Sequence, residues 1–308
     1  KTKLRELYNS IYGIKIKLNQ ISNKINEGFN ISANANPGKE DYNKFTKNLM
    51  QIKNNDQDYP TMIYDGPFSD STCNKEIKGL NFAEISKKEA QKIVEKIFEN
   101  SKVEFSNETN GKFKTYDFYV MKNDLKLYVQ ITKAGGKLLT ISALNDKKAE
   151  IISHEKAIQT AEQFAENLGI KNMKCVWTDV IQSDAYINLA PIINDVIIYP
   201  DLIKVKVDLA TGDITGYEAC AYYTNHTDRQ LAGATISKSA AQNKIDDKYN
   251  IQTVKLALGP IEYEGEILTY EFKCYYQGST YYIYINANTG EEENILKVIE
   301  TQNGNLLM

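Results

Sequence analysis

The sequence predicts an α+β protein made of three tandem small modules, each one helix packed on a small antiparallel β-sheet, preceded by an α-helical segment. The motif Ile-Ser-x-x-x-Ala occurs three times, with its serine at Ser86, Ser153 and Ser237. A hairpin-type turn follows each motif at a similar distance, with a glycine at Gly136, Gly212 and Gly290. Repeats of this length indicate tandem copies of one unit. The 21 tyrosines and the many isoleucines favour sheet.

The composition is that of a water-soluble globular chain, with 42% hydrophobic and 25% charged residues over 308 positions. The net charge of −3 lacks the clustered basic excess of a nucleic-acid-binding protein, so we expect no nucleic-acid partner. No apolar run reaches the ~18 residues of a membrane-spanning helix. The four cysteines form no Cys-x-x-Cys pair, so no zinc site is predicted, and we expect them to be unpaired packing residues.

Residues 1–54 are predicted to be the end of a helical N-terminal region. Apolar residues recur every three or four positions from Leu4 to Ile25, which indicates one helical stripe, and a second helix is expected at residues 41–52. Residues 55–78 form a predicted structured linker. Its segment Asp58–Asp70 is irregular, aromatic and proline-containing, and two interpretations stay open: a linker that docks on the first module, or a recognition loop.

Module 1 is assigned to residues 79–147. Ser86 is expected to cap a helix, and Glu89 completes a capping box with it. The period then changes to two, and strands are predicted at residues 103–105, 113–121, 125–132 and 137–142, with hairpin turns between them.

Modules 2 and 3 are assigned to residues 148–228 and 229–308. Ser153 and Ser237 are the expected helix caps, without a partner equivalent to Glu89. The interval from serine to glycine is longest in module 2, and the extra length falls at Pro191–Pro200, which we interpret as an insertion between strands. Module 3 has a short, poorly apolar helix and strong strands at residues 267–276, 281–286 and 293–298. Tyrosines on both faces of its hairpin suit either packing between modules or a partner interface.

The repeat motif, together with the Val-Asp-Leu-Ala-Thr-Gly-Asp-Ile hairpin at residues 207–214, resembles the PepSY-domain family. Four segments bring the resemblance closer to the YpeB family of spore proteins within it. These are Asp58–Ser69 (Asp-Tyr-Pro-Thr-Met-Ile-Tyr-Asp-Gly-Pro-Phe-Ser), Ala185–Pro191, Tyr199–Val205 and Tyr223–His226. The resemblance covers roughly residues 55–300.

The resemblance implies a non-enzymatic protein of sporulation and germination. Its expected partner is a spore cortex-lytic hydrolase of the SleB type, which it would bind, stabilise and restrain until germination. The implied location is the spore envelope, at the outer face of the inner spore membrane or in the cortex, with a membrane anchor expected upstream of Lys1. The alternative is a module that binds peptidoglycan or another carbohydrate and localises its partner.

The sequence offers little material for catalysis, so no catalytic, cofactor-binding or metal-binding residue is predicted. His154 is expected at the solvated start of a helix, and the repeated serines are explained by capping rather than by nucleophilic chemistry. His226 lies either in a polar connection between modules or at an interface, where Arg229 would supply a bidentate donor. The expected partner-interface residues lie where the copies differ: Tyr59, Tyr64, Asp65, Pro67, Phe68, Tyr199, Asn225, His226 and Arg229. The sequence leaves the oligomeric state open.

Overall fold

The computed structural model describes residues 76–122, 125–143, 152–260, 265–301 and 304–307. The chain divides into two units, Lys1–Thr61 and Met62–Met308, and every described residue belongs to the second. The predicted helical segment at residues 1–54 therefore lies outside the described residues. The boundaries predicted for the modules stay predictions.

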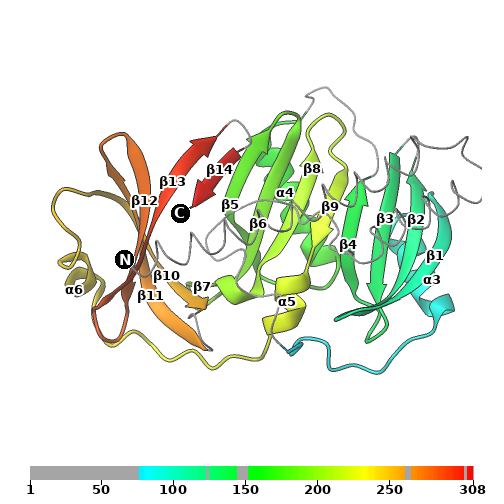
Figure 1. Ribbon diagram of the computed structural model, residues 1–308, viewed down its shortest axis with the longest axis horizontal. Helices are drawn as coiled ribbons and strands as arrows, with labels where there is room; N and C mark the ends of the chain where they lie inside the picture. Colours follow the sequence, from blue (N-terminus) through cyan, green and yellow to red (C-terminus); the bar gives the residue numbers. More distant parts are fainter. Residues whose placement is uncertain (1–75, 123–124, 144–151, 261–264, 302–303, 308) are drawn as a thin grey trace, which may run out of the picture. The chain divides into compact units, whose positions relative to one another are not determined.

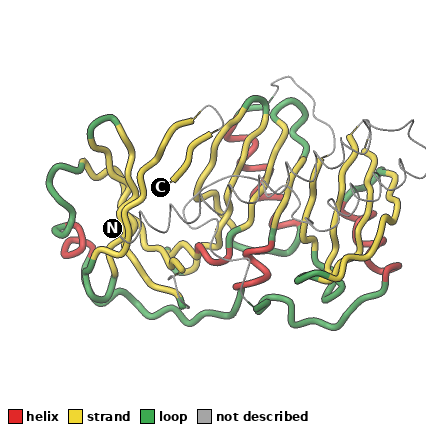
Figure 2. Tube along the Cα trace, viewed as in Figure 1, coloured by secondary structure: helices red, strands yellow, loops and turns green. Residues whose placement is uncertain are grey.

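The described part of the chain is mostly β-structure, so the predicted fold class is wrong (Figure 2). Its 14 strands belong to one sheet, whose strand order is β1-β2-β3-β4-β9-β8-β6-β7-β10-β11-β12-β13-β14, with β5 paired to β6. Each expected module keeps its helix and hairpins. However, the edges of the three small sheets pair with one another, so the modules are parts of one sheet and not separate helix-on-sheet units.

The first repeat forms α3 (Lys87–Ile97) and an antiparallel meander. Its strands are β1 (Lys102–Asn110), β2 (Lys114–Lys122), β3 (Leu125–Thr132) and β4 (Leu138–Ala143). In the second repeat α4 (His154–Asn167) precedes β5 (Met173–Ile181), β6 (Asp184–Ile193), β8 (Ile203–Asp208) and β9 (Ile214–Glu218).

The repeated serines all lie at helix N-termini. The hydroxyl of Ser86 accepts a hydrogen bond from the Glu89 amide at 3.3 Å, and the Glu89 carboxylate accepts one from the Ser86 amide at 2.8 Å, which closes the capping box. Ser153 and Ser237 accept only the forward bond, from the amides three residues on. The serine of the motif thus satisfies backbone donors that a helix start leaves without an intrahelical partner.

The isoleucine and the glycine of the repeat meet in all three copies. Gly136, Gly212 and Gly290 have φ values of 61°, 76° and 76°, in the left-handed region that favours glycine. A Cβ on each would meet the Cδ1 of the isoleucine before the capping serine: Ile85 at 2.7 Å, Ile152 at 3.6 Å and Ile236 at 3.4 Å. The hairpin turn therefore closes over the start of the helix.

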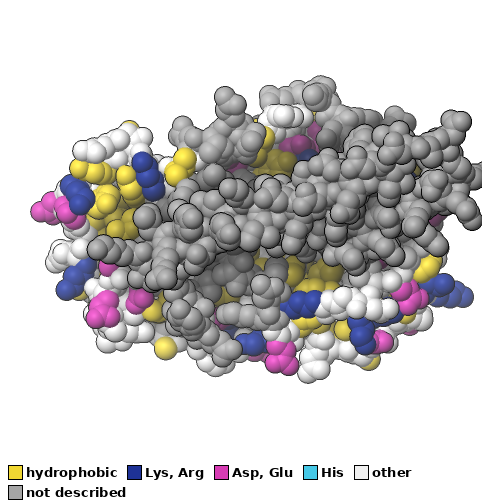
Figure 3. Space-filling model, viewed as in Figure 1, with side chains coloured by type: hydrophobic (Ala, Val, Ile, Leu, Met, Phe, Trp, Pro, Cys, Tyr) yellow, Lys and Arg dark blue, Asp and Glu magenta, His cyan; other side chains and the backbone are white. Residues whose placement is uncertain are grey.

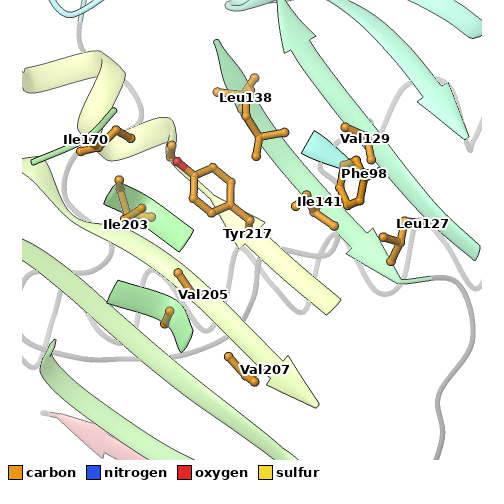
Figure 4. Close-up of a cluster of buried hydrophobic side chains, with 14 of the residues drawn as sticks. Phe98, Leu127, Val129, Leu138, Ile141, Ile170, Ile203, Val205, Val207 and Tyr217 are labelled. Atoms are coloured by element: carbon orange, nitrogen blue, oxygen red, sulfur yellow. The ribbon is translucent and has the colours of Figure 1, made fainter. Parts of the chain in front are cut away.

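Modules 1 and 2 share one core because β4 pairs with β9 (Figure 1). In this register Ile141 lies opposite Tyr217, and Tyr217 lies opposite Val205. Figure 4 shows the Tyr217 side chain among labelled apolar side chains of both modules, including Leu138, Ile141 and Ile203. Ile141, Tyr217 and Val205 are at most 2% exposed, and one continuous apolar cluster runs from the α3 side to the α4 side. Two small marginal cores are thereby merged into one larger core.

The insertion at Pro191–Pro200 joins module 2 to module 3. It contains β7 (Val196–Ile198), which pairs in parallel with β10 (Asn250–Pro260), and it leads into the 3₁₀ turn η1 (Tyr199–Asp201). The third repeat continues with β11 (Glu266–Tyr276), β12 (Ser279–Asn286), β13 (Glu292–Thr301) and β14 (Gly304–Leu307). Its helix α6 (Lys238–Gln242) has only five residues. Neither β10 nor β14 is predicted by the sequence pattern.

The tyrosines of module 3 divide between its two faces. The hydroxyl of Tyr270 donates to the Ile236 carbonyl on the α6 side. Tyr282 lies on the other face, where its ring centroid is 5.7 Å from that of Trp177 in β5. Part of the tyrosine-rich surface therefore packs against module 2.

Candidate functional site

Four of the nine expected interface residues fall within the described residues, and all four lie around the junction of modules 2 and 3. These are Tyr199, Asn225, His226 and Arg229. The other five, Tyr59, Tyr64, Asp65, Pro67 and Phe68, lie outside the described residues. Tyr199 begins η1, and Asn225 ends the short helix α5 (Cys220–Asn225), which follows β9 and is capped by His226. Arg229 lies three residues further along the chain.

Asp201 is the centre of this junction cluster. Its carboxylate lies 2.6 Å from Nδ1 of His226 and 2.9 Å from the guanidinium of Arg229. Arg229 also donates two hydrogen bonds to Glu266 of β11, at 2.6 and 2.8 Å, in the bidentate geometry expected of an arginine–carboxylate pair. The side chains of Asp201 and Arg229 are only 1% and 6% exposed.

Backbone acceptors complete the junction cluster. The Asn225 amide group donates to the carbonyls of Pro200 and Ala221, at 3.0 and 2.8 Å, and the Asn225 carbonyl accepts from Arg229 at 3.0 Å. The His226 ring stacks on Tyr222 with centroids 4.4 Å apart. The connection after α5 is therefore tied to η1 through both side chains and backbone.

Tyr199 contributes to a second buried group beside the junction cluster. Its hydroxyl donates to Glu271 at 2.6 Å, and the Tyr284 hydroxyl donates to the same carboxylate oxygen at 2.9 Å. Burial raises the pKa of Glu271, although the two tyrosine hydrogen bonds oppose this shift. Burial, together with the Glu271 charge, also raises the pKa of both tyrosines well above the ordinary value.

The ion pairs of Arg229 with Asp201 and Glu266 make the junction cluster a clamp between modules 2 and 3. Burial lowers the pKa of the Arg229 guanidinium, but hydrogen bonds and charges from Glu266 and Asp201 outweigh it and raise that pKa overall. Arg229 is thus a permanent cation between two carboxylates from different modules. The N–H groups of Arg229 donate to acceptors within the protein, so they fix module 2 against module 3. Few of these N–H groups remain to bind a ligand.

Among the described residues, the cysteine and histidine side chains do not form a recognisable catalytic or metal-binding group. Burial raises the pKa of the Cys175 and Cys274 thiols to about 11, which disfavours the nucleophilic thiolate. Cys73 lies outside the described residues. His154 is half-buried with Nε2 2.7 Å from the Thr178 hydroxyl, so the expectation of a solvated residue is wrong. No group of His, Cys, Asp or Glu in the described ranges is arranged to hold a metal.

Sequence reasoning missed the carboxylates of the junction. Asp201 stands in the Tyr-Pro-Asp turn, but its partner Arg229 is 28 residues away and Glu266 is 37 residues beyond Arg229. No local pattern links residues at such separations. The polar turn at residues 199–201 within an apolar stretch is the one signal that could have pointed to a buried pair.

Two surface properties of the described residues concern charge and membrane insertion. On the face shown in Figure 3, basic and acidic side chains are interspersed wherever described residues are visible. None of the helices in the described ranges has the length and apolarity needed to cross a bilayer.

The sequence comparisons place this chain, whose described strands form one sheet, among the PepSY-domain proteins. The sequence matches the family described as "YpeB sporulation, PepSY1 and PepSY2 domains" over residues 45–232, and the "Peptidase propeptide and YPEB domain" over residues 235–296. The chain belongs to the YpeB sporulation protein family.

Individual relatives agree with this membership. The sporulation protein YpeB of Halalkalibacterium halodurans is 33% identical over 175 residues, which are 57% of this chain and 39% of that protein. The YpeB protein of Bacillus subtilis is 27% identical over 274 residues, 86% of this chain and 61% of the relative. The chain thus spans less than two thirds of these relatives. The Bacillus megaterium YpeB C-terminal domain has the same fold, with a TM-score of 0.63 and 24% identity over 71% of this chain and all of that domain.

Proposed function

We propose that this chain is a non-enzymatic regulator that binds, stabilises and restrains a SleB-like spore cortex-lytic hydrolase until germination. Membership of the YpeB sporulation family is the observation that carries the proposal. The match of residues 235–296 to a domain described by its occurrence in peptidase propeptides supports it, because a propeptide restrains a hydrolase by binding it.

The structure supports a binding role through the way the modules are joined. The β4–β9 and β7–β10 pairings and the Arg229 clamp fix the modules against one another. A rigid surface loses little conformational entropy when a partner binds, which favours affinity. The raised thiol pKa values and the internal use of the Asp201 and Arg229 side chains favour a role without catalysis.

The proposal places the protein in the spore envelope, at the outer face of the inner spore membrane or in the cortex, held by an anchor upstream of Lys1. Fluorescent fusion to the full-length protein, followed through sporulation, tests this location. Even labelling of the mother-cell cytoplasm would contradict it.

The decisive experiment measures binding and inhibition together. Purified chain is titrated into the purified cortex-lytic enzyme in a calorimeter, and cortex hydrolysis is followed at the same ratios. We expect saturable binding and falling hydrolysis. Binding to purified cortex peptidoglycan without binding to the enzyme would replace the proposal with a carbohydrate-binding role, and turnover of cortex by the chain alone would contradict both.

A further inference from the structure

Strand β13 is the third copy of a strand whose other two copies, β4 and β9, pair with each other. Counting five residues on from the turn glycine of each repeat gives Ile141 in β4, Tyr217 in β9 and Ile295 in β13. The sheet register agrees with this equivalence. Each of the three residues lies opposite a buried apolar residue of the preceding strand: Val129, Val205 and Ile283.

The pairing of β4 with β9 is a short ladder between equivalent strands. Its direct pairs are Thr140 with Glu218, Ile141 with Tyr217 and Ser142 with Gly216. The equivalent residues Ile141 and Tyr217 lie opposite each other, and the residue before one of them lies opposite the residue after the other. The ladder therefore has the register of a local twofold axis. A strand of this type pairs with another strand of the same type.

The equivalent stretch of β13, Asn294–Leu296, has no second partner strand among the described residues. β13 lies between β12 and β14, and β14 pairs with it only at Val298–Thr301 (Figure 1). The edge of Asn294–Leu296 that points away from β12 is thus left open, and we call it the outer edge. Ile295 is 36% exposed there, whereas Ile141 and Tyr217 are 2% and 1% exposed. An open strand edge with an exposed apolar residue is a template for a further strand.

We propose that the outer edge of β13 around Ile295 is an interface between two copies of this chain. Two of the three equivalent strands pair within the chain, and a second copy supplies the missing partner of the third. In the register of the β4–β9 ladder, Ile295 lies opposite the partner's Ile295 on a twofold axis, and Asn294 lies opposite the partner's Leu296. The same surface of both copies then forms the interface, as in most symmetric dimers.

The charges on either side of Ile295 fit this register. Beside the β4–β9 ladder the Ala219 amide donates to the Leu139 carbonyl at 3.1 Å, and the equivalent residues of β13 are Lys297 and Glu293. Each Glu293 therefore lies beside the partner's Lys297, once on either side of the axis. Opposite charges that face each other across antiparallel strands stabilise the pairing, and like charges destabilise it. This charge pattern is complementary to itself, which favours a second copy over an unrelated strand.

β14 leaves room for this ladder. The direct pairs of β4 with β9 involve only three residues on each strand, and a register shift of both strands lies next to them. β13 has its register shift at the same place, opposite Tyr284 and Ile285 of β12. Such a bulge bends the strand and limits the ladder to Asn294–Leu296 and its flanking residues, whereas β14 pairs only from Val298 on. An interface of this size fits a weak dimer, with a Kd of about 10 µM.

Sedimentation equilibrium of the chain at about 1 to 300 µM measures its self-association. We expect a reversible monomer–dimer equilibrium in the wild type. Ile295→Lys should abolish it, because two ammonium groups would meet at the twofold axis. The matched control is Ile299→Lys, at an isoleucine of β13 with the same 36% exposure but in the stretch that pairs with β14. The control should dimerise like the wild type, and circular dichroism should give both variants similar melting temperatures.

Two charge variants test the register. Glu293→Lys sets two lysines of one copy against two lysines of the other, and Lys297→Glu does the same with glutamates. Each variant alone should self-associate about tenfold more weakly than the wild type, or less. An equimolar mixture of the two variants restores both opposite-charge pairs, so it should form a mixed dimer with an affinity close to that of the wild type.

The outcomes separate a second copy from other occupants of the edge. A wild-type chain that stays monomeric over the whole range would overturn the proposal, and so would a dimer that Ile295→Lys leaves intact. Equal losses in Ile295→Lys and Ile299→Lys would point to unspecific apolar contact and overturn it as well. A mixture of the charge variants that fails to associate would overturn the twofold register and the interface with it. A monomeric chain whose binding to the cortex-lytic enzyme is lost in Ile295→Lys would assign the edge to the hydrolase, which overturns this inference and leaves the proposed function intact.

Discussion

In each repeat the turn glycine lies against an isoleucine. Replacing that glycine by alanine should therefore destabilise the protein by an amount that differs between the copies. Gly→Ala at positions 136, 212 and 290 places a Cβ at a positive φ in every copy. This costs about 1 kcal/mol each, because a left-handed conformation is unfavourable for an L-residue.

Position 136 carries an additional steric cost. Its new Cβ would lie 2.5 Å from Ile93 Cδ1 and 2.7 Å from Ile85 Cδ1, closer than carbon atoms can pack. At position 212 the nearest atom is 3.6 Å away and at position 290 it is 3.4 Å away. Both Ile methyl groups lie at the ends of side chains and can shift, so the extra cost is at the lower end of the overpacking range, about 1 kcal/mol.

Urea denaturation and thermal melting of the three variants measure these costs. We expect Gly136→Ala to lower the free energy of unfolding by about 2 kcal/mol and the other two by about 1 kcal/mol. For a chain of this size each kcal/mol corresponds to roughly 3 °C in melting temperature. Repeating Gly136→Ala in an Ile93→Val background removes the closest methyl group and should recover part of the loss. Equal losses at the three positions, or no recovery with Ile93→Val, would refute the steric reasoning.

Three further predictions concern buried or capping groups. Replacing any of the three N-cap serines by alanine should cost about 0.5–2 kcal/mol of unfolding free energy, read from urea curves, and a neutral result would contradict the capping account. Arg229→Ala leaves Asp201 buried without its cation and should cost about 3 kcal/mol, whereas a loss confined to partner binding would identify Arg229 as an interface residue. The raised pKa of Glu271 means that its protonated form is favoured in the folded state, so its contribution to stability is largest below the unfolded pKa and is lost as pH rises through the folded pKa. The melting temperature of Glu271→Gln relative to the wild type should therefore rise as the pH is raised above the ordinary carboxyl pKa of 4.5, and a pH-independent difference would refute the buried-acid assignment.

The local elements were predictable because their signals are local. The period-two pattern places a strand at residues 125–132, and β3 has those bounds. The capping box at Ser86 and Glu89 is readable from the sequence because it depends on residues three positions apart. By contrast, β10 was missed because a bulge between Ile251 and Thr253 interrupts its alternation.

The candidate site was predictable only in part. Differences between the repeat copies pointed to Asn225, His226 and Arg229, and the structure brings these residues together. Their acidic partners could not be predicted, because a buried ion pair between distant segments has no period and no fixed spacing.

The sequence by itself determined the repeat, its helix caps, its hairpins and the family, since each depends on contacts within a few residues or on a recognisable pattern. Only the tertiary structure decided that the modules join into one sheet. The β4–β9 and β7–β10 pairings use backbone N–H and C=O groups, which every residue carries, so no side-chain pattern marks which strand edges will meet. That edge pairing turns the three expected units into one sheet and gives modules 1 and 2 a common apolar core.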